Sequence, residues 1–172
     1  MGTTGAPARR NPRHPSDGQC GTAARNAGLA LVDGAVIDAS VAVKWTLDEP
    51  NSDEALLLAR HVPLAAPGLL LVECANVLWI KSRRSEITVD QAQERYEQLA
   101  SAPIDYLEDR DLLPAALSLS GRLDHPVYDC LYVAASVALQ APLVTADGRL
   151  RRKLLETGPA EFPCLLLSEF AL

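Results

Sequence analysis

The chain of 172 residues has the length of a single domain that can bury a core of its own. Its composition, 48% hydrophobic but only 5% aromatic, suits an α/β protein better than a β-sandwich. The net charge of −6 argues against nucleic-acid binding but does not exclude it, because acids gathered in one pocket can be neutralised by bound cations. The longest apolar runs, at 68–72 and 164–167, are too short to span a bilayer.

The first 33 residues differ in composition from the rest of the chain. They are rich in Gly, Pro, Arg and small polar residues, and they show no apolar periodicity before Leu29. Their first thirty residues carry a net charge of +3, so residues 31–172 carry −9. We interpret residues 1–33 as a disordered extension of a single domain over 34–172. The absence of a signal-peptide core and of any CxxC pair or metal-finger spacing among the four cysteines indicates a cytoplasmic protein with reduced thiols.

From residue 35 onward, short apolar runs alternate with longer helical patterns. The runs predict strands over 35–38, 63–66, 104–106, 142–145 and 163–167. The helical patterns predict helices near 40–46, 52–61, 68–83, 89–101, 112–121, 127–140 and 148–156. Thr88 and Gln91 fit a capping box, and Pro67 is expected to open the third helix. This alternation predicts a parallel sheet covered on both faces, in which ligands bind beyond the carboxyl ends of the strands.

Four acidic residues lie at positions where burial is expected. Asp38 ends the first predicted strand, and Asp147 follows the fourth. Glu73 lies within the apolar helix GLLLVECANVLWI, and Asp129 lies in the first turn of the helix in HPVYDCLYVAASVAL. Each acid alone has an ordinary explanation as a helix cap, a first-turn residue or an exposed side chain. Together, the four could converge on one site.

Converging carboxylates predict a metal ion. Like charges in one pocket raise one another's pKa, and a hard divalent cation such as Mg²⁺ or Mn²⁺ removes that conflict through oxygen ligands. Such an ion can activate water against a phosphodiester. Ser40 and Thr145 could add hydroxyl groups to the site, although a helix cap and an ordinary strand residue explain them equally well.

Four blocks of the sequence resemble the signature blocks of the PIN-domain ribonucleases. They read VIDASVAVKW, PGLLLVECANVLW, VYDCLYVAAS and APLVTADGRL, in this order, and they are most similar to the VapC-type toxins of type II toxin–antitoxin systems. The resemblance covers residues 34–172 and implies a PIN-like three-layer α/β/α sandwich with a central, mainly parallel sheet of four to five strands. Within the blocks, the family's catalytic and metal-binding acids fall on Asp38, Glu73, Asp129 and Asp147. Supporting polar positions fall on Ser40, Asn76 and Thr145.

The resemblance also implies an activity and partners. These are Mg²⁺- or Mn²⁺-dependent endonucleolytic cleavage of RNA, homodimerisation, and inhibition by a VapB-like antitoxin whose C-terminal segment enters the active-site groove. It implies no association with a membrane. Cys130 stands where the family usually has alanine, and being similarly small it should not impair function.

Two basic clusters are candidates for binding RNA phosphates. The favoured one, which directly follows Asp147, comprises Arg149, Arg151, Arg152 and Lys153. The other comprises Lys81, Arg83 and Arg84, and both clusters could instead be solvated helix ends. No catalytic role is assigned to Lys44, Trp45, His125, Tyr128 or Tyr132, because a metal-activated water needs no His or Tyr base.

Three other functions compete with the ribonuclease toxin. A phosphatase of the haloacid-dehalogenase type would need a second aspartate two positions after Asp38, where Ser40 stands. A non-catalytic receiver or partner-binding domain with an acidic pocket is the second alternative. A receiver would need a lysine on the last strand, and 163–167 contains none. A PIN-like RNA-processing nuclease without a toxin role shares every motif and stays open.

Overall fold

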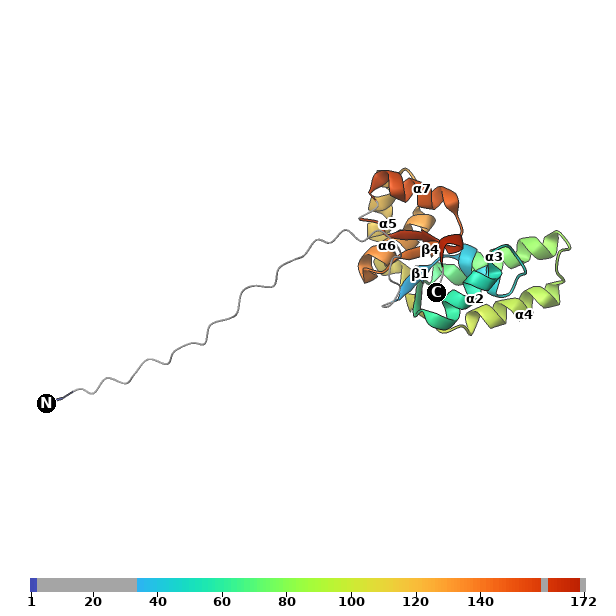
Figure 1. Ribbon diagram of the computed structural model, residues 1–172, viewed down its shortest axis with the longest axis horizontal. Coiled ribbons are helices and arrows are strands. Elements are labelled where there is room, and N and C mark those ends of the chain that lie inside the picture. Colours follow the sequence, from blue (N-terminus) through green and yellow to red (C-terminus); the bar gives the residue numbers. More distant parts are fainter. Residues whose placement is uncertain (3–33, 159–160, 171–172) are drawn as a thin grey trace.

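The fold is built around a central parallel sheet (Figure 1). The computed structural model describes residues 1–2, 34–158 and 161–170, so the extension expected at 1–33 lies almost wholly outside the described residues. The five strands are β1 (Ala35–Ile37), β2 (Leu64–Pro67), β3 (Ile104–Leu107), β4 (Leu143–Thr145) and β5 (Cys164–Leu166). All four neighbouring pairs are parallel. The five predicted strands are confirmed to within one residue at each end.

The strand order is β3-β2-β1-β4-β5. The chain therefore moves outward from β1 through β2 to β3, then returns to the other side of β1 to form β4 and β5. Val36 pairs with Leu143 and Ile37 with Val144 at the point where the order reverses. In a parallel sheet such a reversal leaves a crevice beyond the carboxyl ends of the two strands. The topology thus fixes where a ligand site is expected.

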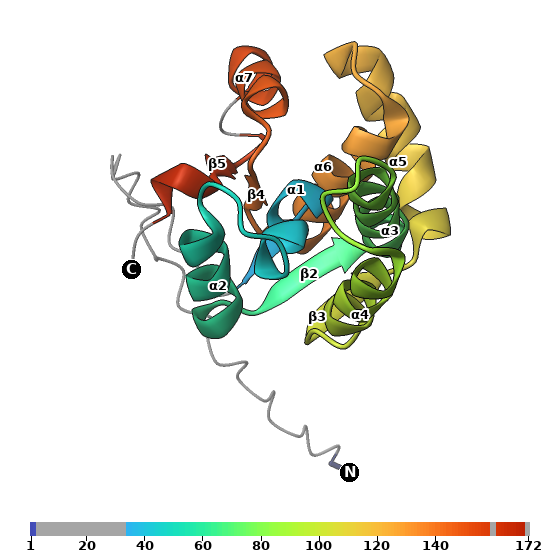
Figure 2. The same ribbon diagram turned by 90° about the vertical axis from the view of Figure 1, so that its right-hand side faces the viewer.

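Helices cover both faces of the sheet, which confirms the three-layer architecture (Figure 2). The connections between β1 and β3 contain α1 (Ala39–Ala42), η1 (Val43–Trp45), α2 (Ser52–His61), α3 (Leu69–Arg83) and α4 (Val89–Ala100). The later segments are α5 (Asp109–Leu123), α6 (Val127–Leu139), α7 (Gly148–Thr157) and η2 (Leu167–Glu169). Because parallel crossovers are right-handed, the two groups of connecting helices fall on opposite faces. In keeping with this, α6 packs on β1, β2 and β4, while α3 contacts β2 and α1 contacts β4.

Helix starts differ from the sequence-based expectation at two prolines. Pro67 ends β2, and the third helix begins only at Leu69, after Gly68. The fifth helix begins at Asp109, three residues before the predicted start, and runs through Pro114. Its first turn is acidic, which complements the helix dipole, and the Asp109 carboxylate accepts a hydrogen bond of 3.1 Å from the amide of Leu69. Pro114 is the sixth residue of α5, so the helix continues past it without the hydrogen bond that an amide there would donate.

The helices α3 and α4 extend together beyond the sheet as an antiparallel arm (Figure 1). The predicted capping box opens α4: the Thr88 amide donates to Gln91 Oε1 at 2.9 Å, and the Gln91 amide donates to Thr88 Oγ1 at 3.1 Å. Leu78 is buried between the two helices, whereas its neighbour Trp79 is exposed. Across the ranges described, no helix has both the length and the apolar character needed to cross a membrane.

Candidate active site

A pocket of about 250 Å³ lies where β1 and β4 end. All four acids singled out in the sequence reach it, together with Ser40 and Asn76. The side chains and backbone that line it belong to Asp38, Ala39, Ser40, Glu73, Asn76, Val77, Asp129, Tyr132 and Asp147. Among these described lining residues there are four carboxylates and no lysine, arginine or histidine. The pocket therefore concentrates negative charge with no cationic side chain in its wall.

Asp38 is the most deeply placed of the acids. It follows β1 directly and caps the N-terminus of α1, so its Oδ1 accepts hydrogen bonds from the Val41 amide at 3.2 Å and the Ser40 hydroxyl at 2.5 Å. Its Oδ2 accepts a short hydrogen bond from the Thr145 hydroxyl. Burial raises the pKa of Asp38 to about 6, although these three donors, which favour the ionised form, oppose the rise. Local capping therefore explains only part of why an acid ends a buried strand.

Ser40 and Thr145 join the ends of β1 and β4. The Ser40 hydroxyl accepts a hydrogen bond of 2.8 Å from the Ala146 amide while it donates to Asp38. Thr145, which is fully buried, accepts one of 2.9 Å from the Asp147 amide. Asp147 then caps α7, and its Oδ1 accepts from the Arg149 amide at 2.7 Å. The two hydroxyl groups thus hold the acids of neighbouring strands in one rigid network.

Glu73 and Tyr132 meet across the pocket. Glu73 comes from α3 on one face of the sheet, and the hydroxyl of Tyr132, from α6 on the other face, donates to Glu73 Oε2 at 2.5 Å. Burial raises the pKa of Glu73, the Tyr132 hydrogen bond opposes this, and the nearby Asp129 charge adds to the rise. Asn76 lies one turn after Glu73 and is exposed at the rim. Tyr132 received no role from the sequence, yet its spacing of three residues from Asp129 already placed both on one helix face.

Asp129 projects from the first turn of α6, and its partner is His125. The His125 Nε2 atom lies 2.9 Å from Asp129 Oδ2. Burial raises the pKa of Asp129, His125 opposes this rise, and the charge of Asp147 reinforces it. His125 precedes the helix, so helical periodicity gave no signal for this contact. The pKa is raised in Asp38, Glu73 and Asp129 alike, so the pocket disfavours the ionised form of each carboxyl group.

The donor set of the pocket fits a hard divalent cation. Carboxylate, hydroxyl and amide oxygens are the groups that Mg²⁺ and Mn²⁺ prefer, and a bound cation would favour the ionised form of the carboxylates, whose pKa burial raises. Over the described ranges, no three His, Cys, Asp or Glu side chains are grouped closely enough to enclose an ion on their own. Mg²⁺ usually takes one or two carboxylates and keeps several water ligands, so it does not require such an enclosure.

Each basic cluster contains one side chain whose charge is already paired with an acid. Arg151 bonds to Glu169 of η2, with its Nη2 atom 2.8 Å from the carboxylate. Lys81 on α3 contacts two acids, Glu49 at 3.2 Å and Glu86 at 2.7 Å. Other members of the α7 cluster, Arg149 and Arg152, are exposed, and Lys153 is half-buried.

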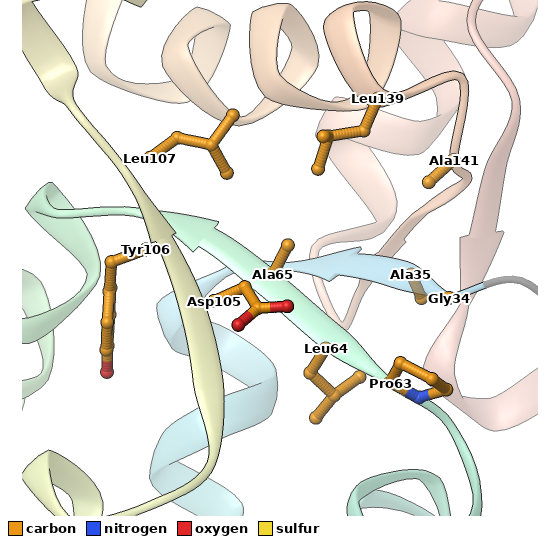
Figure 3. Close-up of a pocket in the computed structure, with 10 residues that line it drawn as sticks. All are labelled: Gly34, Ala35, Pro63, Leu64, Ala65, Asp105, Tyr106, Leu107, Leu139 and Ala141. Atoms are coloured by element: carbon orange, nitrogen blue, oxygen red, sulfur yellow. The ribbon is translucent and has the colours of Figure 1, made fainter.

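A second cavity, of about 270 Å³, lies at the opposite end of the sheet (Figure 3). It opens where β1, β2 and β4 begin, beside β3, and its lining is mostly apolar, with Leu64, Leu107 and Leu139 among the labelled side chains. Asp105 is the one charged residue of the described lining. The cavity therefore lacks the converging acids of the first pocket, and catalytic chemistry is expected only at the carboxyl edge.

Solved structures share the fold at low sequence identity. A crystal structure of a protein from Pyrobaculum aerophilum matches with a TM-score of 0.58 at 24% identity, over 71% of this chain and 80% of that one. VapC20 of Mycobacterium tuberculosis, described as a Sarcin-Ricin loop cleaving toxin, matches at 0.55 and 16% identity, over 69% and 94%. VapBC2 of Rickettsia felis, bound to a DNA fragment from its promoter, matches at 0.52 and 14% identity, over 77% and 97%.

Sequence comparison identifies the family. Ribonuclease VapC3 of Pyrobaculum aerophilum is 30% identical over 124 residues, which cover 69% of this chain and 92% of the relative. Ribonuclease VapC1 of Mycobacterium tuberculosis is 32% identical over the same number of residues, 69% of this chain and 90% of the relative. The model of the PIN domain matches residues 35–153, a range that contains all four acids of the pocket. The chain therefore belongs to the PIN-domain family.

Proposed function

We propose that this protein is a divalent-metal-dependent endoribonuclease that acts as the toxin of a toxin–antitoxin pair. The observation that carries the proposal is the pocket itself, where four carboxylates from α3, α6 and the ends of β1 and β4 meet with no cationic side chain in the described wall. The names of the curated relatives, Ribonuclease VapC3 and Ribonuclease VapC1, support the ribonuclease assignment.

The metal would be Mg²⁺ or Mn²⁺, held by Asp38, Glu73, Asp129 and Asp147. When bound, such an ion activates water as a nucleophile and stabilises negative charge on a phosphodiester. Asp38 is the anchor of the set, because three donors fix its carboxylate. Ser40 and Thr145 hold Asp38 and Asp147 at a constant separation, and Tyr132 fixes the orientation of Glu73.

RNA would reach the pocket past the N-terminal end of α7. Arg149 follows Asp147 by two residues and is exposed, as is Arg152 one turn later, so both can contact phosphates beside the scissile bond. Arg151 is the weaker candidate of the cluster because its guanidinium group already pairs with Glu169. Lys153 is half-buried and completes the cluster.

The partners would be an RNA substrate, a VapB-like antitoxin and a second copy of the chain. The antitoxin proposal is supported by the fold shared with VapBC2 of Rickettsia felis. An antitoxin would hold the nuclease inactive and assemble with the toxin homodimer into a larger complex.

The decisive experiment is cleavage of purified cellular RNA with Mg²⁺ or Mn²⁺, compared with the same reaction in chelator. We expect discrete products from the wild-type protein and none from Asp129→Asn. Asp105→Asn is the matched control, since it makes the same chemical change in the apolar cavity at the other end of the sheet. Equal cleavage by both variants would overturn the assignment of the site.

Toxicity is tested separately from cleavage. Expression in a bacterial host should arrest growth, and coexpression with the product of the neighbouring upstream gene should restore it. Metal-dependent cleavage without growth arrest would instead identify an RNA-processing nuclease.

A further inference from the structure

The turn between α5 and α6 holds His125 in a fixed position. Its amide donates to the Ser120 carbonyl at 3.3 Å, and the Ser120 hydroxyl donates to the His125 carbonyl at 2.6 Å. Asp124, just before it, ends α5 in the left-handed conformation at φ 48°. Pro126, just after it, restricts the backbone of His125 to extended conformations. The histidine is therefore clamped from both sides before α6 begins.

The imidazole of His125 lies beside one carboxylate oxygen of Asp129. Its Nε2 atom lies 2.9 Å from Asp129 Oδ2, while only 18% of the histidine side chain and 30% of the aspartate side chain are exposed. Nε2 is buried, and within the described residues no atom meets it with full hydrogen-bond geometry, so the contact to Asp129 is oblique. Oblique contacts of this kind in ligand-free sites commonly tighten when the site is loaded.

The other acids of the pocket follow the same pattern. Glu73 has its Oε2 bonded to Tyr132, and Asp147 has its Oδ1 bonded to the Arg149 amide. In each case the second oxygen has no hydrogen-bond partner among the described residues. Only Asp38 has both oxygens engaged. Glu73 and Asp147 are thus hydrogen-bonded at one oxygen, and Asp129 has His125 against one oxygen, so each of the three has its other oxygen available.

We propose that His125 is a positioning residue that holds Asp129 by Oδ2 so that Oδ1 is presented to the metal. This inference rests on the proposed function, because it assigns His125 a task only if Asp129 is a metal ligand. Partners that orient ligating side chains matter energetically: their loss typically lowers metal affinity or activity 10- to 100-fold.

The test compares variants that keep or remove the donor. In His125→Gln an amide nitrogen occupies nearly the place of Nε2, whereas His125→Phe keeps the ring and loses the donor. His61→Phe is the matched control, because His61 is an exposed residue at the end of α2. Ser120→Ala loosens the turn but leaves the imidazole donor in place. For each variant we would measure Mn²⁺ affinity by calorimetry, kcat and KM on RNA, and the free energy of unfolding in chelator.

We expect His125→Phe to bind Mn²⁺ about 10- to 100-fold more weakly, with a lower kcat and an unchanged KM for RNA. His125→Gln should retain near wild-type values, and Ser120→Ala should lose stability but not Mn²⁺ affinity. If His125→Phe does not fold, His125→Asn serves in its place, because its amide is too short to reach Asp129.

Two results would overturn the inference alone. One is wild-type Mn²⁺ affinity in a folded variant without the donor. The other is an equal loss in His125→Gln and His125→Phe, which would indicate a role in shape only. A wild-type protein that neither binds Mn²⁺ nor cleaves RNA would overturn the proposed function and this inference together.

Discussion

Asp38 combines three hydrogen-bond donors with almost complete loss of water. Its pKa of about 6 lies above the value of 3.8 for an unperturbed aspartate, and burial is the largest cause. Because one pH unit between the two pKa values corresponds to about 1.36 kcal/mol, the ionised carboxylate lowers the stability of the metal-free fold by about 3 kcal/mol. Asp38 therefore destabilises the metal-free fold, a cost that the proposed metal ion would offset.

Replacing Asp38 by asparagine should change the pH dependence of stability. Because the pKa of Asp38 is higher in the folded than in the unfolded state, the wild-type fold is most stable below about pH 4, where Asp38 is protonated in both states. The wild type loses stability as the pH rises through 6 and the buried carboxyl group ionises. Asp38→Asn lacks this loss, so its free energy of unfolding relative to the wild type should rise by about 2.4 kcal/mol between pH 4 and pH 7. Urea denaturation in chelator measures the difference. Parallel pH profiles for the two proteins would contradict the prediction.

The hydroxyl of Thr145 donates a hydrogen bond to the same Asp38 carboxylate. Thr145→Val removes the hydroxyl at nearly constant volume and leaves the ionised Asp38 with one donor fewer. Hydrogen bonds to charged groups contribute about 1.5–3 kcal/mol, so a loss of about 2 kcal/mol is expected at pH 7.5. Thr145→Ser keeps the donor and should lose clearly less in the same denaturation assay. Equal losses would assign the effect to packing.

At the scale of elements, periodicity predicts most of this fold. Strand ranges and the α4 capping box follow from local sequence, and strand–helix alternation places Asp38 and Asp147 on one edge of the sheet. The contact between Thr145 and Asp38 depends on β1 pairing with β4, and local sequence does not specify strand order. The contact between His125 and Asp129 depends on the left-handed turn at Asp124, which no helical or strand periodicity in the sequence indicates.

The ion pair between Arg151 of the α7 cluster and Glu169 of η2 also could not be predicted from local sequence. Glu169, the partner of Arg151, belongs to the 3₁₀ turn η2, for which the sequence offered no helical pattern. Spacing located the basic residues of α7, whose role in RNA binding stays a prediction, but it could not distinguish paired from exposed charges.

The N-terminal half of α7 should contribute to RNA affinity through Arg149 and Arg152. Replacing both by alanine should weaken RNA binding and make its salt dependence shallower by about 0.7 in log–log slope for each phosphate that is no longer neutralised. Fluorescence anisotropy at several salt concentrations, with Asp129→Asn as background to prevent cleavage, measures both quantities. The same measurements on Arg83→Ala with Arg84→Ala test the alternative basic cluster, at the end of α3. An unchanged slope in the α7 variant would exclude a role for these two arginines in phosphate binding.

At the scale of the whole molecule, the proposed metal site should couple the stability of the fold to the binding of a cation. A cation that binds the folded chain alone stabilises it by about 2.7 kcal/mol at a concentration of 100 times its Kd. Mn²⁺ should therefore raise the melting temperature of the wild type in a concentration-dependent way. Asp147→Asn should show a clearly smaller rise, because it removes one of the four carboxylates. The same rise in both proteins would indicate a metal site elsewhere.

The strand order also has a consequence for synthesis. The hydrogen bond between Asp38 and Thr145 joins residues that are 107 positions apart in the chain. Their strands, β1 and β4, are neighbours in the sheet, but β1 is synthesised first and β4 late. A nascent chain on the ribosome accordingly carries Asp38 and Glu73 long before Asp129 and Asp147 emerge. No productive site can assemble until nearly the whole domain has left the exit tunnel. Chains that terminate before β4 should therefore lack a complete site.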